Sequence, residues 1–114
     1  MERVFVKDII NSKIAVSPEK GELLYRYLEN AIHKRKKTTL SFLDVNDTTT
    51  AFLNKAIGNL YNHFSSDVLN QTLTIADMDN LDKYLLSKVI TRAKLDIKTN
   101  ENLTKNIDEV FENE

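Results

Sequence analysis

The pattern of apolar and polar positions along the chain predicts strands that alternate with helices. Residues 3–10 are rich in β-branched apolar side chains, which favours a first strand. Residues 13–16 continue this pattern, and Asn11 and Ser12 are typical turn residues between two strands. We therefore expect a hairpin at the start of the chain.

A long helix is expected over 18–35. Ser17 can accept a hydrogen bond from a free backbone N–H, and Pro18 suits the first helical position because no N–H is lost there. The segment ends in the basic run 34–37, and cations are favourable near a helix C-terminus. Apolar residues recur at the spacing of one helical face: Leu23, Leu24, Tyr27, Leu28, Ala31 and Ile32.

A buried central strand is expected over 38–45, because this β-branched, apolar segment lies between two helical patterns. A second amphipathic helix is expected from about residue 52 to residue 64. Gly58 lies inside that helix, where glycine costs about 1 kcal/mol relative to alanine. We therefore expect close packing against a strand at Gly58.

A short strand over 72–76 precedes a third helix, which Asp77 or Asp79 caps and which continues to Ala93. The order of elements is then strand, strand, helix, strand, helix, strand, helix. This order predicts an α/β fold, a single-domain sandwich whose small mixed sheet of about four strands is packed by three to four helices, mainly on one face. We assign residues 1–98 to this domain.

The remaining segment, 99–114, is an acidic amphipathic tail or a short helix. Its apolar residues recur at intervals of three to four, and its acidic residues are numerous. Two interpretations stay open, namely a fourth packed helix and a detachable segment that binds a partner groove. The apolar residues are Leu103, Ile107, Val110 and Phe111.

Composition narrows the classes of function. Sixteen basic residues nearly balance seventeen acidic ones, so nucleic-acid binding is disfavoured as the main role. The chain has no Cys and only two Gly, which excludes thiolate chemistry and a standard glycine-rich phosphate loop. No apolar run is long enough for a membrane span or a signal peptide, so a cytoplasmic protein without a cofactor is expected.

The sequence contains no arrangement typical of a catalytic or metal site. His33 and His63 lie near the ends of different predicted helices, without paired-ligand spacing. Ser41 lies inside a predicted strand and lacks the G-x-S-x-G context of a serine nucleophile. Four aspartates follow predicted strand ends and suit either a divalent-cation site or helix capping: Asp44, Asp47, Asp77 and Asp79.

Three threonines, 48–50, stand directly before the second predicted helix. Four N–H groups at a helix start lack intrahelical partners, and Asp47 or a threonine hydroxyl can satisfy one of them for about 1 kcal/mol. A phosphoryl group at this place would gain from the helix dipole but would add about two negative charges beside Asp44 and Asp47. That repulsion could expel a partner.

The chain resembles a known family at this point. A Ser-Pro-opened helix, then TTLSFLDVNDTTTAFLNKAIGNLY, then TLTIADMDNLDKYLLSKVITRA, is similar to the bacterial STAS-like domain family of unknown function. That family in turn resembles the anti-sigma factor antagonists. The likeness covers about residues 13–95 and rests on patterns of apolar and hydroxyl residues, so it implies the fold more than an activity.

The resemblance implies a regulated contact. In anti-sigma factor antagonists, a partner kinase that is also the anti-sigma factor phosphorylates a serine at the start of the corresponding helix. That position falls at Thr49, Thr50 or Ala51, and the switch is absent if it is Ala51. The usual Asp-Ser-Ser-Gly run is replaced here by DTTTA, 47–51. The similarity also implies a bacterial or phage setting and an ATPase or kinase-like partner.

Two functional hypotheses follow. The first is a non-enzymatic regulatory module that binds a protein through the loop and helix start at 44–54. The alternative is a nucleic-acid-associated accessory protein that uses the basic run 34–37 with Arg92 and Lys94, marked by a steep fall of binding with salt. For the first hypothesis the expected contact residues are Asp44, Asn46, Asp47, Thr48, Thr49, Thr50 and Asn54.

Overall fold

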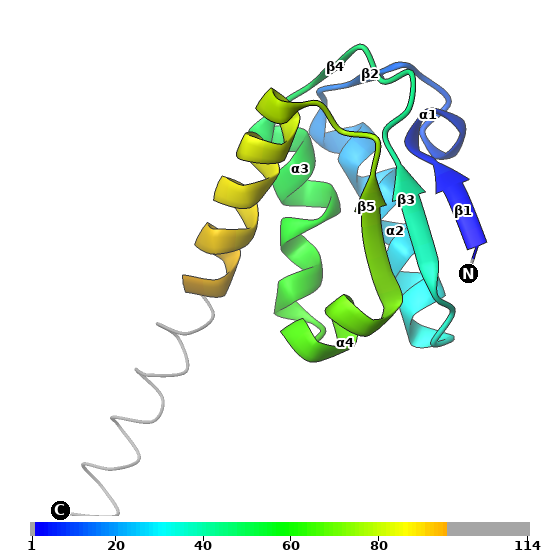
Figure 1. Ribbon diagram of the computed structural model, residues 1–114, viewed down its shortest axis with the longest axis vertical. Helices are drawn as coiled ribbons and strands as arrows, with labels where there is room; N and C mark the ends of the chain where they lie inside the picture. Colours follow the sequence, from blue (N-terminus) through cyan, green and yellow to red (C-terminus); the bar gives the residue numbers. More distant parts are fainter. Residues whose placement is uncertain (1, 96–114) are drawn as a thin grey trace, which may run out of the picture.

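The computed structural model describes residues 2–95. At its centre is a three-stranded parallel sheet in the order β1 (Glu2–Phe5), β3 (Thr38–Ser41), β5 (Leu73–Ala76), shown in Figure 1. β3 is therefore the middle strand, and all four of its residues are buried. The prediction of a buried central strand is confirmed, although the strand ends at Ser41 rather than at residue 45.

A second, smaller parallel sheet pairs β2 (Ile14–Ala15) with β4 (Asp47–Thr48). It lies above the carboxyl end of β3, at the top of Figure 1. The backbone N–H of Asn46 also donates to the carbonyl of Lys13, at 2.8 Å. These bonds hold the loop after β3 against the segment that leads into the long helix.

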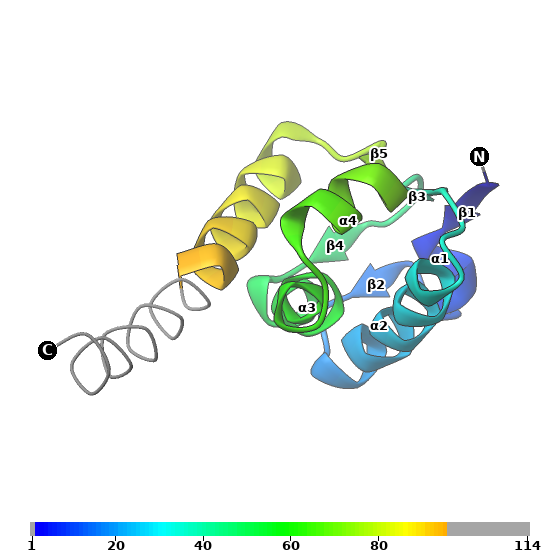
Figure 2. The ribbon, with the colours of Figure 1, turned by 90° about the horizontal axis from the view of Figure 1, so that it is seen from below.

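Helices cover mainly one face of the central sheet. α2 (Pro18–His33) and α3 (Thr50–Ala56) lie side by side on that face, as Figures 1 and 2 show. A helix over 80–95 follows β5 and lies beside α3. Shorter helices complete the described chain: α1 (Val6–Ile9), the 3-10 helix η1 (Gly58–Asn62) and α4 (Ser66–Thr72). The prediction of an α/β fold is confirmed.

The hydrophobic core lies between the central sheet and these helices. Leu40 on β3 is fully buried, and so are Leu28 on α2 and Phe52 on α3. Val4 and Ile75 flank Leu40 in the sheet register and pack against the same core. The next residues along each strand point to the opposite face, because side chains alternate along a strand.

The predicted hairpin at the start of the chain is wrong. Residues 6–9 form the helix α1, and β2 pairs with β4 instead of turning back onto β1. Val6 and Ile10 are one helical turn apart, and both are fully buried against the core. The result is two parallel sheets in place of the single mixed sheet that the sequence suggested.

Capping residues define the helix ends. The side chain of Ser17 accepts a hydrogen bond from the Lys20 N–H, at 3.2 Å, as predicted. Asp79, and not Asp77, caps helix 80–95, because its carboxylate accepts from the Asp82 N–H at 2.8 Å. At the end of α2, Arg35 has a left-handed backbone with φ 56°.

The second predicted helix is interrupted. α3 ends at Ala56, and the chain continues as η1 and then α4, which the sequence did not predict. α4 is capped by Ser65, whose hydroxyl accepts from the Val68 N–H at 3.2 Å. Gly58 is closely packed, but against a helix rather than a strand, since a Cβ there would lie 3.1 Å from Val89 Cγ1 of helix 80–95.

We expect a pH dependence of stability at the alkaline end from Tyr25. Burial first, and then the hydrogen bond to Glu29 at 2.7 Å, raise the pKa of Tyr25 to about 12. The ordinary pKa of tyrosine is about 10, so this contribution is fully present below pH 10 and is lost as the pH rises toward 12. Urea unfolding of wild type and Tyr25→Phe between about pH 10 and pH 12 measures this contribution to stability. The phenylalanine variant should lose less stability with rising pH, and parallel curves would contradict the assignment.

Candidate functional site

The threonine run is held by its own hydroxyl groups. Thr48 is buried in β4, and its hydroxyl donates to the Ala15 carbonyl at 3.0 Å. Thr49 is the N-cap of α3, since its hydroxyl accepts from the Phe52 N–H at 3.2 Å and donates to the Val16 carbonyl at 2.8 Å. The capping prediction is therefore confirmed for Thr49. Both hydroxyls are occupied in anchoring the loop.

Thr50 differs from its two neighbours. It is exposed at the first position of α3 and forms no side-chain hydrogen bond within residues 2–95. Asn54 is exposed one helical turn further along the same helix. Of the two predicted phosphorylation candidates, Thr50 has the accessible hydroxyl. The Thr49 hydroxyl already donates one hydrogen bond and accepts another.

The other predicted contact residues lie on the loop between β3 and α3. Asp44, Asn46 and Asp47 are all exposed. Asp44 has a left-handed backbone with φ 65° and forms an ion pair with Lys7 of α1, at 2.8 Å. The hydrogen bond from Lys7, reinforced by its charge, lowers the pKa of Asp44 below its ordinary value. Asp44 is thus bound to a cation, whereas Asn46 and Asp47 have no charged partner within residues 2–95.

The four aspartates that follow strand ends do not form one cluster. Asp44 pairs with Lys7, Asp77 contacts Ser41 and Arg3, and Asp79 is a helix cap. Among residues 2–95, no group of three or more acidic or histidine side chains is placed to hold a metal ion. Capping and ion pairing therefore account for three of the four carboxylates in the described structure, and Asp47 is exposed in β4.

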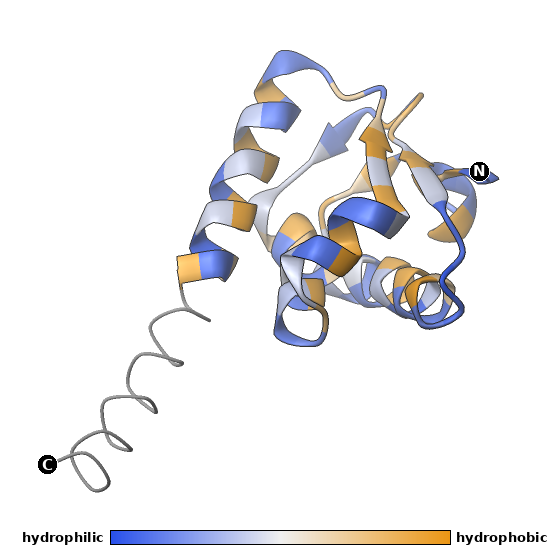
Figure 3. Ribbon diagram, turned by 60° about the horizontal axis from the view of Figure 1, so that its bottom comes forward, coloured by the Kyte–Doolittle hydropathy of each residue, from blue (hydrophilic) through white to orange (hydrophobic). Residues whose placement is uncertain are grey.

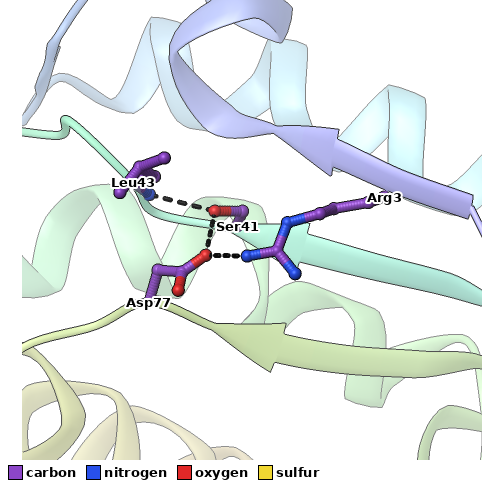
Figure 4. Close-up of polar contacts among 4 residues, drawn as sticks. All are labelled: Arg3, Ser41, Leu43 and Asp77. Carbon is purple, nitrogen blue, oxygen red and sulfur yellow. Dashed lines mark hydrogen bonds and ion pairs between the residues drawn. The ribbon is translucent and has the colours of Figure 1, made fainter.

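A polar cluster that the sequence did not indicate joins the three strands of the central sheet. Figure 4 shows Asp77 between Ser41 and Arg3. The Ser41 hydroxyl donates to the Asp77 carboxylate at 2.5 Å and accepts from the Leu43 N–H at 3.1 Å, and Arg3 donates to the same carboxylate oxygen. Asp77 has a left-handed backbone with φ 63°. Since the Ser41 residue has no exposed surface, this cluster fixes the strand ends rather than offering a nucleophile.

The remaining candidates have structural contacts. The His33 ring packs on Phe64 and the His63 ring packs near Tyr25, with ring centroids 5.0 and 6.0 Å apart. The basic run 34–37 stands at the opposite end of β3 from the threonine run and is exposed. Lys36 in this run forms an ion pair with Glu2, at 2.9 Å. Lys94 lies over the Tyr61 ring, 5.7 Å from its centroid.

The parallel sheet, the hydroxyl-anchored loop and the helix pair together define a small STAS-like α/β domain. The chain belongs to the family of STAS-like domains of unknown function, whose family model matches residues 20–83, and the resemblance seen in the sequence is confirmed. The matched region includes β3, the threonine run and α3. Comparisons with curated proteins and with solved structures found no match. Within residues 2–95, no helix has the length and apolar character needed to cross a membrane.

Replacing Thr49 with alanine is expected to lower the free energy of unfolding by about 1 kcal/mol, because the first turn of α3 loses its cap. Thr50→Ala removes a hydroxyl without an internal partner and is expected to change stability by less than about 0.5 kcal/mol. Urea unfolding of both variants makes the comparison. Equal losses of unfolding free energy in the two variants would show that the Thr49 hydroxyl does not stabilise the helix start more than the Thr50 hydroxyl does.

Proposed function

We propose that the protein is a non-enzymatic regulatory module that binds a protein partner through the loop and helix start at 44–54. The observation that carries this proposal is that Thr48 and Thr49 use their hydroxyls to hold the loop, whereas Thr50 is exposed. Thr48 and Thr49 anchor the loop to residues 15–16, so Thr50 is presented to solvent on a fixed backbone. Polar groups that protrude from a well-anchored loop are typical of binding surfaces.

The contact surface is made of Asn46, Asp47, Thr50 and Asn54. All four side chains are exposed; Asn46 and Asp47 precede the two anchoring threonines, and Thr50 and Asn54 lie on α3. Thr48 and Thr49 support this surface and do not contribute their hydroxyls to it. Asp44 belongs to its edge, where Lys7 neutralises its charge.

Family similarity supports a kinase-like ATPase as the class of partner, because the STAS-like family resembles the anti-sigma factor antagonists. The modification site is then Thr50. A phosphoryl group on Thr50 adds up to about two negative charges to the middle of the contact surface, and this changes the affinity for the partner.

A pull-down from a lysate of the source organism tests the proposal, with the full chain as bait. Three baits are compared: wild type, Thr50→Glu and Asn70→Glu. Asn70 is an exposed residue of α4, at the opposite end of the molecule from the threonine run in Figure 1, and supplies the same charge change away from the surface. We expect one protein to be retained by wild type and Asn70→Glu and lost with Thr50→Glu, and to bind again when both proteins are purified.

Retention by all three baits would place the contact elsewhere on the molecule. Failure of the purified pair to bind would remove the retained protein as a direct partner. Stability of each bait is measured in parallel, since a misfolded variant would also lose retention.

The nucleic-acid alternative has weaker support. Lys34, Arg35 and Lys37 are exposed, but Lys36 is engaged by Glu2 and the chain as a whole carries no excess of positive charge. Binding to phosphate backbone falls steeply with salt, whereas binding through Thr50 and Asn54 should be far less sensitive. A titration of DNA and RNA oligonucleotides at two salt concentrations distinguishes the two functions.

A further inference from the structure

A groove runs between α3 and helix 80–95. Thr50 and Asn54 line it from α3, and Leu85, Lys88, Arg92 and Leu95 line it from the other side. Its volume is about 660 Å³. The groove therefore begins at the proposed contact surface and continues along helix 80–95 toward residue 95.

The groove is positively charged. Lys88 and Arg92 are exposed, and among residues 2–95 no acidic side chain lines the groove. Lys88 lies 5.1 Å from the centroid of the Tyr84 ring, and neither cation forms a salt bridge within residues 2–95. A neighbouring hollow shares Asn54 and Arg92 with the groove, and its Lys55 forms an ion pair with Glu22 at 3.4 Å, so Lys88 and Arg92 carry the positive charge. Cations gathered in a concave surface attract a negatively charged ligand.

The groove is also partly apolar. Leu85 and Leu95 lie on the groove side of helix 80–95, and Leu95 is 57% exposed. The spacing of Leu85, Lys88, Arg92 and Leu95 follows one helical face, so two basic groups lie between two apolar groups along the groove. In Figure 3 this helix likewise alternates between hydrophobic and hydrophilic residues along its length. A matching ligand needs apolar and acidic groups at similar intervals.

We propose that the acidic segment 101–114 of this same chain docks in the groove. The segment lies outside the described residues, and the argument for it is its sequence. It has five acidic residues against one lysine, which complements Lys88 and Arg92. Its apolar residues recur at intervals of three to four and match Leu85 and Leu95 in kind: Leu103, Ile107, Val110 and Phe111.

The chain is long enough for this docking. The groove follows helix 80–95 from Leu85 to Leu95, which is about 15 Å at 1.5 Å per residue. Residues 96–100 can span about 16 Å when extended, which suffices to reverse direction. Segment 101–114 would cover about 20 Å with helical spacing. The segment can therefore run back along the groove and reach Thr50.

Docking would cover Thr50 and Asn54 and so compete with the partner. This regulatory consequence rests on the proposed function, but the docking itself does not. The segment would act as an internal inhibitor, and a partner would bind only the fraction of molecules in which the groove is open.

The test uses the full chain, which has no natural Cys. A nitroxide spin label is attached to the variant Asn106→Cys, and amide NMR signals are compared before and after reduction of the label. We expect signal loss at Thr50, Asn54, Lys88 and Arg92, and none at Lys34 or Lys37. Roughly 1 M salt, where the Debye length is about 3 Å, should restore much of the lost signal.

Two double variants test whether the positive charge of the groove is required for docking. Lys88→Glu with Arg92→Glu should abolish the signal loss in the groove, whereas Lys34→Glu with Lys37→Glu, an equal change of net charge, should leave it intact. Lys88→Ala with Arg92→Ala serves as a milder version if the first pair perturbs the amide spectrum. Absence of signal loss in the groove, or equal behaviour of the two pairs, overturns the proposal.

Mixing separates docking within one chain from docking between copies. Spin-labelled, isotopically unlabelled protein is mixed with isotope-labelled protein that carries no nitroxide. Signal loss in this mixture as strong as in the labelled chain itself would mean that the segment binds a second copy, and would overturn docking within the chain. If the label reports docking but no partner is captured through Thr50, the docking stands and the proposed function fails.

Discussion

Replacing Gly21 with alanine is expected to lower the free energy of unfolding by about 3 kcal/mol, the upper end of the usual cost of overpacking. Gly21 is buried on α2 at its contact with α3. A Cβ on this residue would lie 2.8 Å from Lys55 Cβ and 2.9 Å from the Phe52 carbonyl oxygen. Because backbone on α3 cannot move aside as a flexible side chain can, the two helices must separate.

Gly58→Ala is the matched control for this prediction. The Cβ of alanine at Gly58 would lie 3.1 Å from Val89 Cγ1, which is the end of a side chain. We expect a change of less than about 1 kcal/mol, since a small shift of one side chain relieves the contact. Urea unfolding measures both variants. A loss at Gly21→Ala no larger than at Gly58→Ala would contradict a close helix crossing at Gly21.

Replacing Ser41 with alanine is expected to lower the free energy of unfolding by about 2 kcal/mol. The lost hydroxyl donates a hydrogen bond to the Asp77 carboxylate and accepts one from the Leu43 N–H. Asp77 would keep Arg3 but lose its contact with the central strand, and the Leu43 N–H would lose its acceptor. The variant should therefore have a lower urea midpoint than wild type, with little change in the m-value, the slope of unfolding free energy against urea concentration.

Ser87→Ala is the control, since Ser87 is exposed on helix 80–95 and should tolerate the change within about 0.5 kcal/mol. A double-mutant cycle of Ser41→Ala with Asp77→Ala then measures the coupling, which we expect to be about 1 kcal/mol. Additive effects of the two substitutions would show that the hydroxyl and the carboxylate act independently.

The elements that the sequence predicted well have strong local signals. Ser17 and Pro18 mark the start of α2, and its apolar stripe marks the buried face, so neither depends on the rest of the chain. Residues 6–9 are different, because their β-branched side chains favour a strand while the spacing of Val6 and Ile10 also fits a helix. The core decides between the two, and it buries both residues. The local sequence therefore does not distinguish a strand from a helix at residues 6–9.

The helix start after the threonine run was predicted, but the residue that caps it was not. The pattern before α3 indicated a cap from Asp47 or a threonine, and only the structure distinguishes Thr49 from the accessible Thr50. The cluster of Arg3, Ser41 and Asp77 was not predicted at all. These residues belong to three different strands or strand ends of a parallel sheet, so no spacing in the sequence connects them.

The parallel pairing of the strands also bears on how the chain folds. Glu2 pairs with Thr38 and Thr38 pairs with Leu73, so strand partners are separated by about 35 residues. Among the described strands, no two consecutive ones pair with each other, so this part of the chain has no hairpin that could form early on its own. Each sheet contact requires closure of a long loop, while α2 needs only local contacts. On a ribosome, the first strand must wait unpaired until the central strand has emerged.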